Sequence, residues 1–143
     1  MNKLGKDELF SIAIMLDLPD LLAFCKSDER INQLICKKEY IWRTKLNKEF
    51  PDWKSFNLDK TLEESYKFLY QLKVVQKFLK EKANKGYSLT ELYNLQSLDL
   101  SNNQLTEIPD LNLPNLQQLW LDDNRLTEIP EKLKKQQGLI IIQ

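Results

Sequence analysis

The sequence predicts an α/β repeat fold, in which a helical bundle and a capping helix lead into a short solenoid with a small parallel sheet. Three observations support this prediction. A 15-residue segment recurs in the C-terminal third, apolar residues before it recur at spacings of three and four, and the last residues are the β-branched run GLIIIQ. We expect three parts: a helical domain over 1–60, a linking helix within 61–88, and the repeats over 89–143.

The repeat is plain in the sequence. LQSLDLSNNQLTEIP over 95–109 returns as LQQLWLDDNRLTEIP over 116–130, with ten of fifteen positions identical at a period of 21. The L-x-x-L-x-L-x-x-N-x-L spacing resembles the leucine-rich repeat. Alternate leucines of each short strand are then expected to point inward, while Asn103 and Asn124 are placed to bond the backbone where the chain turns.

The final run is predicted to be the strand of a third coil. Adding 21 residues to Leu119 and Leu121 gives Ile140 and Ile142. Because a coil contacts only its neighbours, one edge of this strand is expected to be open, or to be closed by something outside the chain. A homodimer through the edge strand 139–142 is one way to close it.

The same period stacks the outward-facing positions into rows. A tryptophan between acidic and apolar neighbours on such a solvent-facing surface indicates protein binding. The alternative is that Trp120 shields its neighbours or lies under another part of the chain. The predicted partner-binding residues are Asp99, Gln118, Trp120, Asp122, Leu139 and Ile141.

A helix is predicted over 62–84, with one apolar face that caps the first coil. That face consists of Phe68, Leu69, Leu72, Val75 and Leu79. A second face is predicted to be solvated; it consists of Tyr66, Tyr70, Lys73, Lys77 and Lys80. Residues 85–88 are expected to end this helix and begin the next segment. Charge favours docking, because 60–88 carries a net +4 and 89–143 a net −4.

The first 60 residues are predicted to form short helices. Pro19 suits the first turn of the second helix. Ser27 is expected to cap the third helix, because acidic residues follow it directly. A fourth helix carries Ile41, Trp42 and Leu46.

The order and spacing of several residues in this region resemble the F-box. They are Glu8-Leu9, Ile12, Leu16, Asp20-Leu21-Leu22, Cys25, Ile35 and Trp42. The chain departs from that pattern at two places: it has Leu4-Gly5 where an F-box usually opens with Leu-Pro, and Arg30-Ile31 where Arg-Trp or Lys-Trp is usual.

F-box helices followed by leucine-rich repeats resemble the substrate-recognition subunits of Skp1–cullin ubiquitin ligases, which are also plentiful in large DNA viruses of amoebae. The resemblance implies that the helices dock a Skp1-type adaptor while the repeats hold a target. The implied adaptor-binding residues are Leu4, Leu9, Ile12, Leu16, Leu21 and Leu22. The alternative is that these residues pack against the 62–84 helix, which leaves a scaffold or self-associating repeat protein.

Composition argues against catalysis and against several partner classes. The sequence has no histidine, only three glycines and no nucleotide or metal motif, so no enzyme activity, cofactor or metal is expected. The formal net charge is zero, which gives no argument for nucleic acid. The longest apolar runs, such as 12–16 and 139–142, are too short to span a bilayer.

The two cysteines, Cys25 and Cys36, lie in apolar-periodic stretches. The simplest interpretation is two free thiols in a reducing compartment, with a disulfide as the alternative. Residues 1–8 lead directly into an amphipathic pattern rather than a signal peptide. The expected location is therefore cytoplasmic, in the host cytoplasm if the source is viral.

Overall fold

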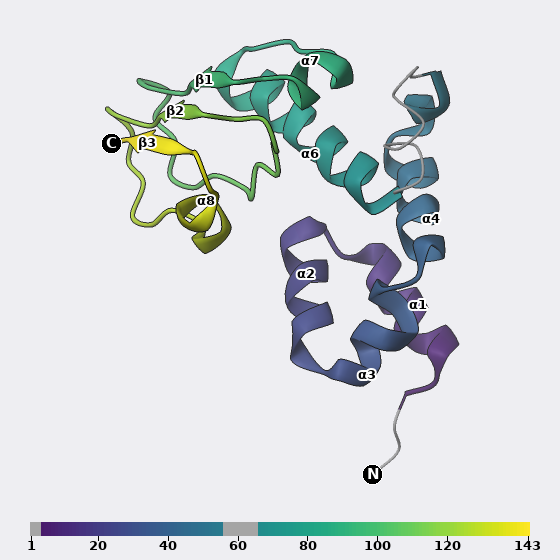
Figure 1. The fold of residues 1–143 in the computed structure, drawn as a ribbon. Helices are drawn as coiled ribbons and strands as arrows, with labels where there is room; N and C mark the ends of the chain where they lie inside the picture. The colour runs from purple at the N-terminus through teal and green to yellow at the C-terminus, as the bar shows by residue number, and fades with distance from the viewer. Residues whose placement is uncertain (1–3, 56–65) are drawn as a thin grey trace. The chain divides into compact units, whose positions relative to one another are not determined.

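The computed structural model describes residues 4–55 and 66–143, which belong to two compact units (Figure 1). One unit is Met1–Tyr70 and the other is Gln71–Gln143, so the division falls inside helix α6 (Tyr66–Ala83). The N-terminal side is helical and the C-terminal side carries a parallel sheet, as predicted. The first residues of the predicted 62–84 helix lie outside the described residues, and the three-part division at residues 60 and 88 stays a prediction.

Residues 4–55, the part of the N-terminal unit described before α6, form short helices. They are α1 (Lys6–Met15), α2 (Leu18–Ser27), α3 (Glu29–Ile31), the π-helix η1 (Asn32–Cys36), α4 (Glu39–Glu49) and the 3₁₀ segment η2 (Pro51–Ser55). Pro19 lies in the first turn of α2, as predicted, and Asp17 caps it by accepting from the Asp20 N–H at 3.0 Å.

The predicted cap of the third helix is wrong by one residue. Asp28 caps α3, because its Oδ1 accepts from the Arg30 N–H at 2.7 Å. Ser27 instead closes α2, where its hydroxyl donates to the Phe24 carbonyl at 2.7 Å. A short serine side chain serves a helix C-terminus as readily as an N-terminus, because it can bond the carbonyl one turn back.

The π-helix η1 is the centre of the N-terminal unit, since it contacts α1, α2 and α4. Its residues Ile35 and Cys36 are buried beside Trp42 of α4. The Trp42 indole N–H donates to the Cys36 carbonyl at 2.9 Å, which satisfies its one donor inside the core. The predicted fourth helix and its apolar residues thus form the wall against which η1 packs.

The two cysteines are not free thiols. Cys25 of α2 and Cys36 of η1 form a disulfide with their Cα atoms 6.0 Å apart. The interpretation as separate core thiols is therefore wrong in this structure. The physical reason is that α3 turns the chain back and brings η1 against α2, which places two residues separated by 11 positions on facing surfaces.

A buried cation is paired at the end of α1. Lys45 is 1 % exposed, and its ammonium group lies 2.9 Å from the Glu49 carboxylate and donates to the Leu16 carbonyl. Burial of a charge is tolerated only with such partners. The Tyr70 hydroxyl donates to both Glu49 oxygens, and burial together with this carboxylate raises the pKa of the phenol.

The predicted solvated face of the middle helix is only partly solvated. Lys77 and Lys80 are exposed, but Tyr70 and Lys73 are buried. Tyr70 is buried because it completes the Lys45–Glu49 cluster of the N-terminal unit, and the Lys73 ammonium donates to the Gln76 side chain at 3.0 Å. The apolar face was predicted better, since Leu69, Leu72, Val75 and Leu79 are all buried while Phe68 is half-buried.

Within the C-terminal unit, α6 and α7 (Leu89–Tyr93) lie beside the first coil (Figure 1). The Gln71 side chain accepts from Asn112 of that coil at 2.9 Å. Helix α6 ends at Ala83, within one residue of the predicted end at 84, and Asn84 follows it with φ 53°. Ser88 and Glu91 then form a capping box at the start of α7, and their bonds lower the pKa of Glu91.

The three strands are β1 (Ser97–Asp99), β2 (Gln118–Trp120) and β3 (Ile140–Ile142), paired in parallel in that order. The predicted inward positions of the first two coils are buried, except Leu126, which is half-buried. The buried ones are Leu98, Leu100, Leu105, Ile108, Leu119, Leu121 and Ile129. Asn102 and Asp123, 21 residues apart, both turn the chain with positive φ values of 59° and 57°. These residue types tolerate that conformation best after glycine.

Asn124 joins the two coils, as the pattern predicted. Its Oδ1 accepts from the Asn103 and Leu105 N–H groups, both at 3.0 Å, and its Nδ2 donates to the Leu100 and Leu121 carbonyls. Asn103 makes a single bond of this kind, to the Ser101 carbonyl at 3.1 Å. One amide therefore satisfies backbone groups of two successive coils.

The register of the third strand differs from the prediction by one residue. Leu98 pairs with Leu119 at an offset of 21, but Leu119 pairs with Ile141 at an offset of 22. The first coil returns through extended chain, whereas the second returns through helix α8 (Glu131–Lys135). A helix advances about 1.5 Å per residue against about 3.3 Å for extended chain, so the helical return needs more residues.

We expect Asn124→Ala to lower the free energy of unfolding of the repeats by about 2–3 kcal/mol, because several buried backbone groups lose their partner. Asn103→Ala is the matched control and should cost no more than about 1 kcal/mol. Urea unfolding followed by circular dichroism measures both. Equal costs would contradict the bridging role of Asn124.

Candidate functional site

The outward face of the sheet gathers two rows of side chains, one from each outward strand position. Ser97, Gln118 and Ile140 are aligned in the first row, and Asp99, Trp120 and Ile142 in the second. We call these six residues the sheet face. Ser97, Asp99, Gln118 and Ile140 are exposed, while Trp120 and Ile142 are half-buried.

The sheet face changes from polar to apolar from β1 through β2 to β3. The first strand offers a hydroxyl and a carboxylate, the second an amide and an indole, and the third two isoleucines. Ile140 is 61 % exposed, which makes it the most exposed of the large apolar side chains described in this unit. Exposed aliphatic and aromatic groups next to a polar rim are typical of protein interaction surfaces.

Asp99 holds a fixed orientation at the polar end. Its Oδ1 accepts from the Ser101 hydroxyl at 2.6 Å and from the Ser101 N–H at 2.9 Å. These bonds lower the pKa of the Asp99 carboxyl, with a smaller contribution from the charge of Lys85. The sheet face therefore presents one negative charge at neutral pH.

The structure brings together three of the six predicted partner-binding residues, namely Asp99, Gln118 and Trp120. Asp122 is half-buried and follows β2. The predicted outward positions of Leu139 and Ile141 are wrong, because the offset of 22 turns Ile141 to the same side as buried Leu119 and leaves Leu139 before the strand.

Sequence reasoning missed Ile140 and Ile142 as members of the sheet face. One signal could have revealed them. The segment EKLKK after Pro130 has strong helix formers where the first coil has DLNLP, so the two return segments were not interchangeable.

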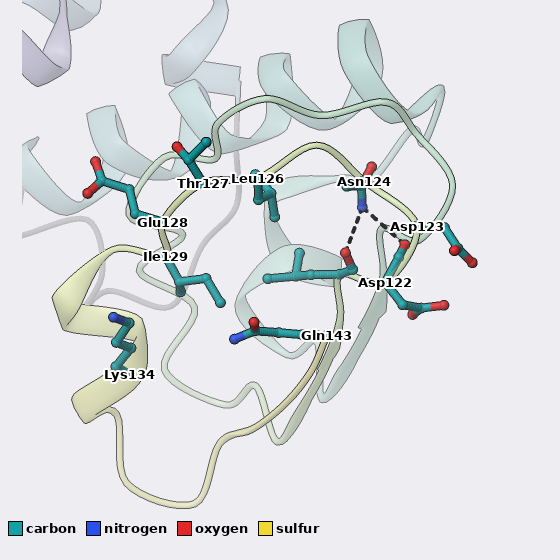
Figure 2. A pocket seen from close by; sticks show the side chains of 10 residues that line it. Asp122, Asp123, Asn124, Leu126, Thr127, Glu128, Ile129, Lys134 and Gln143 are labelled. Atoms are coloured by element: carbon teal, nitrogen blue, oxygen red, sulfur yellow. Dashed lines mark hydrogen bonds between the residues drawn. The ribbon is translucent and has the colours of Figure 1, made fainter.

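A hollow of about 270 Å³ lies beyond the end of β2 (Figure 2). Asp122, Asp123 and Asn124 line one side, and Ile129, Lys134 and Gln143 the other. Its charged groups are of both signs. Among the described residues, no group of three histidine, cysteine, aspartate or glutamate side chains could hold a metal ion.

A second hollow, of about 380 Å³, adjoins the sheet face at the beginning of the strands. It shares Gln118 and Ile140 with the face. Its lining contains no charged side chain, and five of its nine residues carry carboxamides: Gln96, Asn115, Gln117, Gln118 and Gln137. This surface offers uncharged donors and acceptors beside exposed aliphatic groups.

The predicted adaptor-binding residues belong to the N-terminal unit and divide by exposure. Leu9 and Leu21 are core residues, 3 % and 0 % exposed, and Leu16 and Leu22 are half-buried. Leu4 and Ile12 are exposed at 46 % and 39 %. Met15, one turn beyond Ile12 on α1, is 80 % exposed. Only part of the predicted set is therefore available to a partner without unfolding.

Comparison with known proteins identifies the repeats. The family model for leucine-rich repeats (two copies) matches residues 93–135, which confirms that prediction for this segment. No curated protein and no solved structure matches the chain. Repeats of this family are generally non-catalytic modules that bind other proteins. The F-box resemblance and the viral source stay predictions.

The described part of the chain contains no helix with the length and apolar character needed to cross a membrane.

The register of β3 generates a direct test. Ile141→Lys should lower the free energy of unfolding by about 1–2 kcal/mol, because it places a charge among the inward leucines. Ile140→Lys should change it by less than about 0.5 kcal/mol, because that position faces solvent. Urea unfolding of the two variants measures the difference. If Ile140→Lys were instead the more destabilising variant, β3 would pair at an offset of 21.

Proposed function

We propose that this protein binds another protein through the sheet face and has no catalytic role. The observation that carries the proposal is the alignment of Trp120 with Ile142 beside exposed Ile140. Aromatic and aliphatic groups of this kind supply most of the binding energy at protein interfaces, while polar neighbours set orientation. Asp99 and Gln118 provide that polar margin.

The chemistry around the sheet face favours a protein partner over a nucleic acid. Its one charged residue, Asp99, is negative, and the adjoining hollow is lined by carboxamides and aliphatic groups. A polyanion needs clustered lysine or arginine side chains along its path. The described rows of the sheet face have none, so electrostatics would oppose a phosphate backbone there.

The finer proposal is a substrate-recognition adaptor of a Skp1–cullin ubiquitin ligase in the cytoplasm, or in the host cytoplasm of a virus. It rests on the F-box resemblance and on three exposed apolar residues, Leu4 before α1 and Ile12 and Met15 within it. The alternative is a scaffold or self-associating protein whose N-terminal helices make no adaptor contact. Pairing through strand 139–142 belongs to that alternative.

Photo-crosslinking tests the sheet face. A benzophenone side chain at Gln118 should capture a partner in the source cell, while the same group at exposed Glu107, on the turn side of the first coil, should not. Adding Trp120→Ala should reduce the Gln118 adduct at least about tenfold, the loss expected for a central interface tryptophan. Equal adducts at both positions would contradict binding by the sheet face.

Light scattering tests the adaptor proposal. The chain alone should have a mass of 17.0 kDa and should form a heterodimer with a Skp1-type adaptor. Ile12→Asp should abolish the heterodimer, because it charges an exposed position of α1. Asn47→Asp on α4 adds the same charge and should leave the heterodimer intact.

A 17.0 kDa species in both runs would contradict the adaptor proposal. Twice that mass without the adaptor would instead support self-association.

A further inference from the structure

The Cys25–Cys36 disulfide crosslinks η1, the element at the centre of the N-terminal unit, to α2. It ties α2 to the last residue of η1, and η1 contacts α1, α2 and α4. Figure 1 shows α2 and the α3 segment side by side, in agreement with their mutual contacts. A single covalent bond thus constrains the segment through which the other helices of this unit meet.

The clamped segment has an unusual backbone. Asn32–Cys36 is a π-helix, and the Lys37 N–H donates to the Asn32 carbonyl at 2.9 Å, five residues back. Such turns are rare and occur mainly as single insertions at functional positions. An ordinary α-helical path would rotate Cys36 by about 100° about the helix axis, which would carry its sulfur away from α2. The disulfide therefore favours the π-helical path.

We propose that this disulfide is a redox-responsive clamp, and that reduction by a dithiol releases residues 28–38 to open locally while the leucine-rich repeats keep their structure. The proposal concerns the N-terminal unit alone and does not depend on the sheet face. A cytoplasmic location makes it consequential, because thiol reductants there keep most cysteines reduced.

Cys25 and Cys36 differ in exposure to solvent, and this difference determines which sulfur the reductant attacks. Cys25 is half-buried, whereas Cys36 is 5 % exposed. A dithiol thiolate attacks the Cys25 sulfur, the bond between the sulfurs breaks, and Cys36 leaves as a thiolate that takes a proton from solvent. The second thiol of the reductant then attacks the mixed disulfide. Cys25 is released as a thiol, and the dithiol ends as its own disulfide after giving two electrons.

The effect of reduction follows from chain entropy. The crosslink excludes open conformations of the chain between the two cysteines, which are 11 positions apart in the sequence. For a loop of this length the entropic model gives roughly a 100-fold change in the opening equilibrium. Ile35 and the hydrogen bond from Trp42 to the Cys36 carbonyl remain after reduction, so the segment should open transiently rather than stay unfolded.

Hydrogen exchange of the full chain, read by mass spectrometry with and without dithiothreitol, tests the proposal. Reduction should raise exchange in peptides covering 28–38 by roughly 100-fold, the opening expected for this loop. Peptides covering 97–142 should be unchanged. The double variant Cys25→Ser with Cys36→Ser is the matched control; it should exchange like the reduced protein and should not respond to dithiothreitol.

Three results would overturn the proposal. Two titratable thiols in protein purified in air would mean that the bond does not form. Equal exchange before and after reduction would mean that the bond constrains nothing. Faster exchange throughout 97–142 would mean that it stabilises the whole chain rather than a local segment. Should the double variant fail to fold, the comparison of oxidised and reduced wild-type protein still decides among these results.

Discussion

Neither coil of the repeat can bury its leucines alone, and this constraint governs the C-terminal unit. Leu98 and Leu119 are fully buried because successive strands stack in register, and Leu89 and Leu92 of α7 are buried in the same unit. The backbone groups brought inside by this stacking need partners, and Asn124 supplies several at once. The exposed sheet face follows from the same stacking, because inward and outward positions alternate along each strand.

The N-terminal unit meets a similar demand by other means. Its helices are too short to bury much surface singly, so they converge on η1 and include a paired buried cation. Lys45 satisfies carbonyls at the end of α1 while Glu49 holds both Lys45 and Tyr70. Polar groups therefore serve as structural links in both units: an amide joins the coils in one, and a buried lysine of α4 bonds the carbonyl end of α1 in the other.

How far the sequence predicts this structure depends on how local the determining forces are. The sequence predicts the roles of Leu98, Leu119 and Asn124 because equivalent residues occur in both copies of the repeat. The place of Pro19 in the first turn of α2 was predicted because the preference of proline for that turn is local. Tyr70 was misplaced because its burial depends on Glu49, 21 positions away. The disulfide was missed because no periodicity shows that α3 returns Cys36 to Cys25. The predicted outward positions were off by one residue in β3, since the helical return through α8 changes the number of residues between strands.

The two unequal return segments also bear on how this architecture can change. The second coil accommodates one more residue than the first, yet the strands of both stay paired and the inward leucines stay buried. The difference in length is thus absorbed in the segments that return the chain from one strand to the next. Insertions around 131–137, natural or engineered, should therefore cost the neighbouring coils little stability, provided that each one keeps β3 in register. The composition of the sheet face and the length of the return segments can therefore change independently of each other.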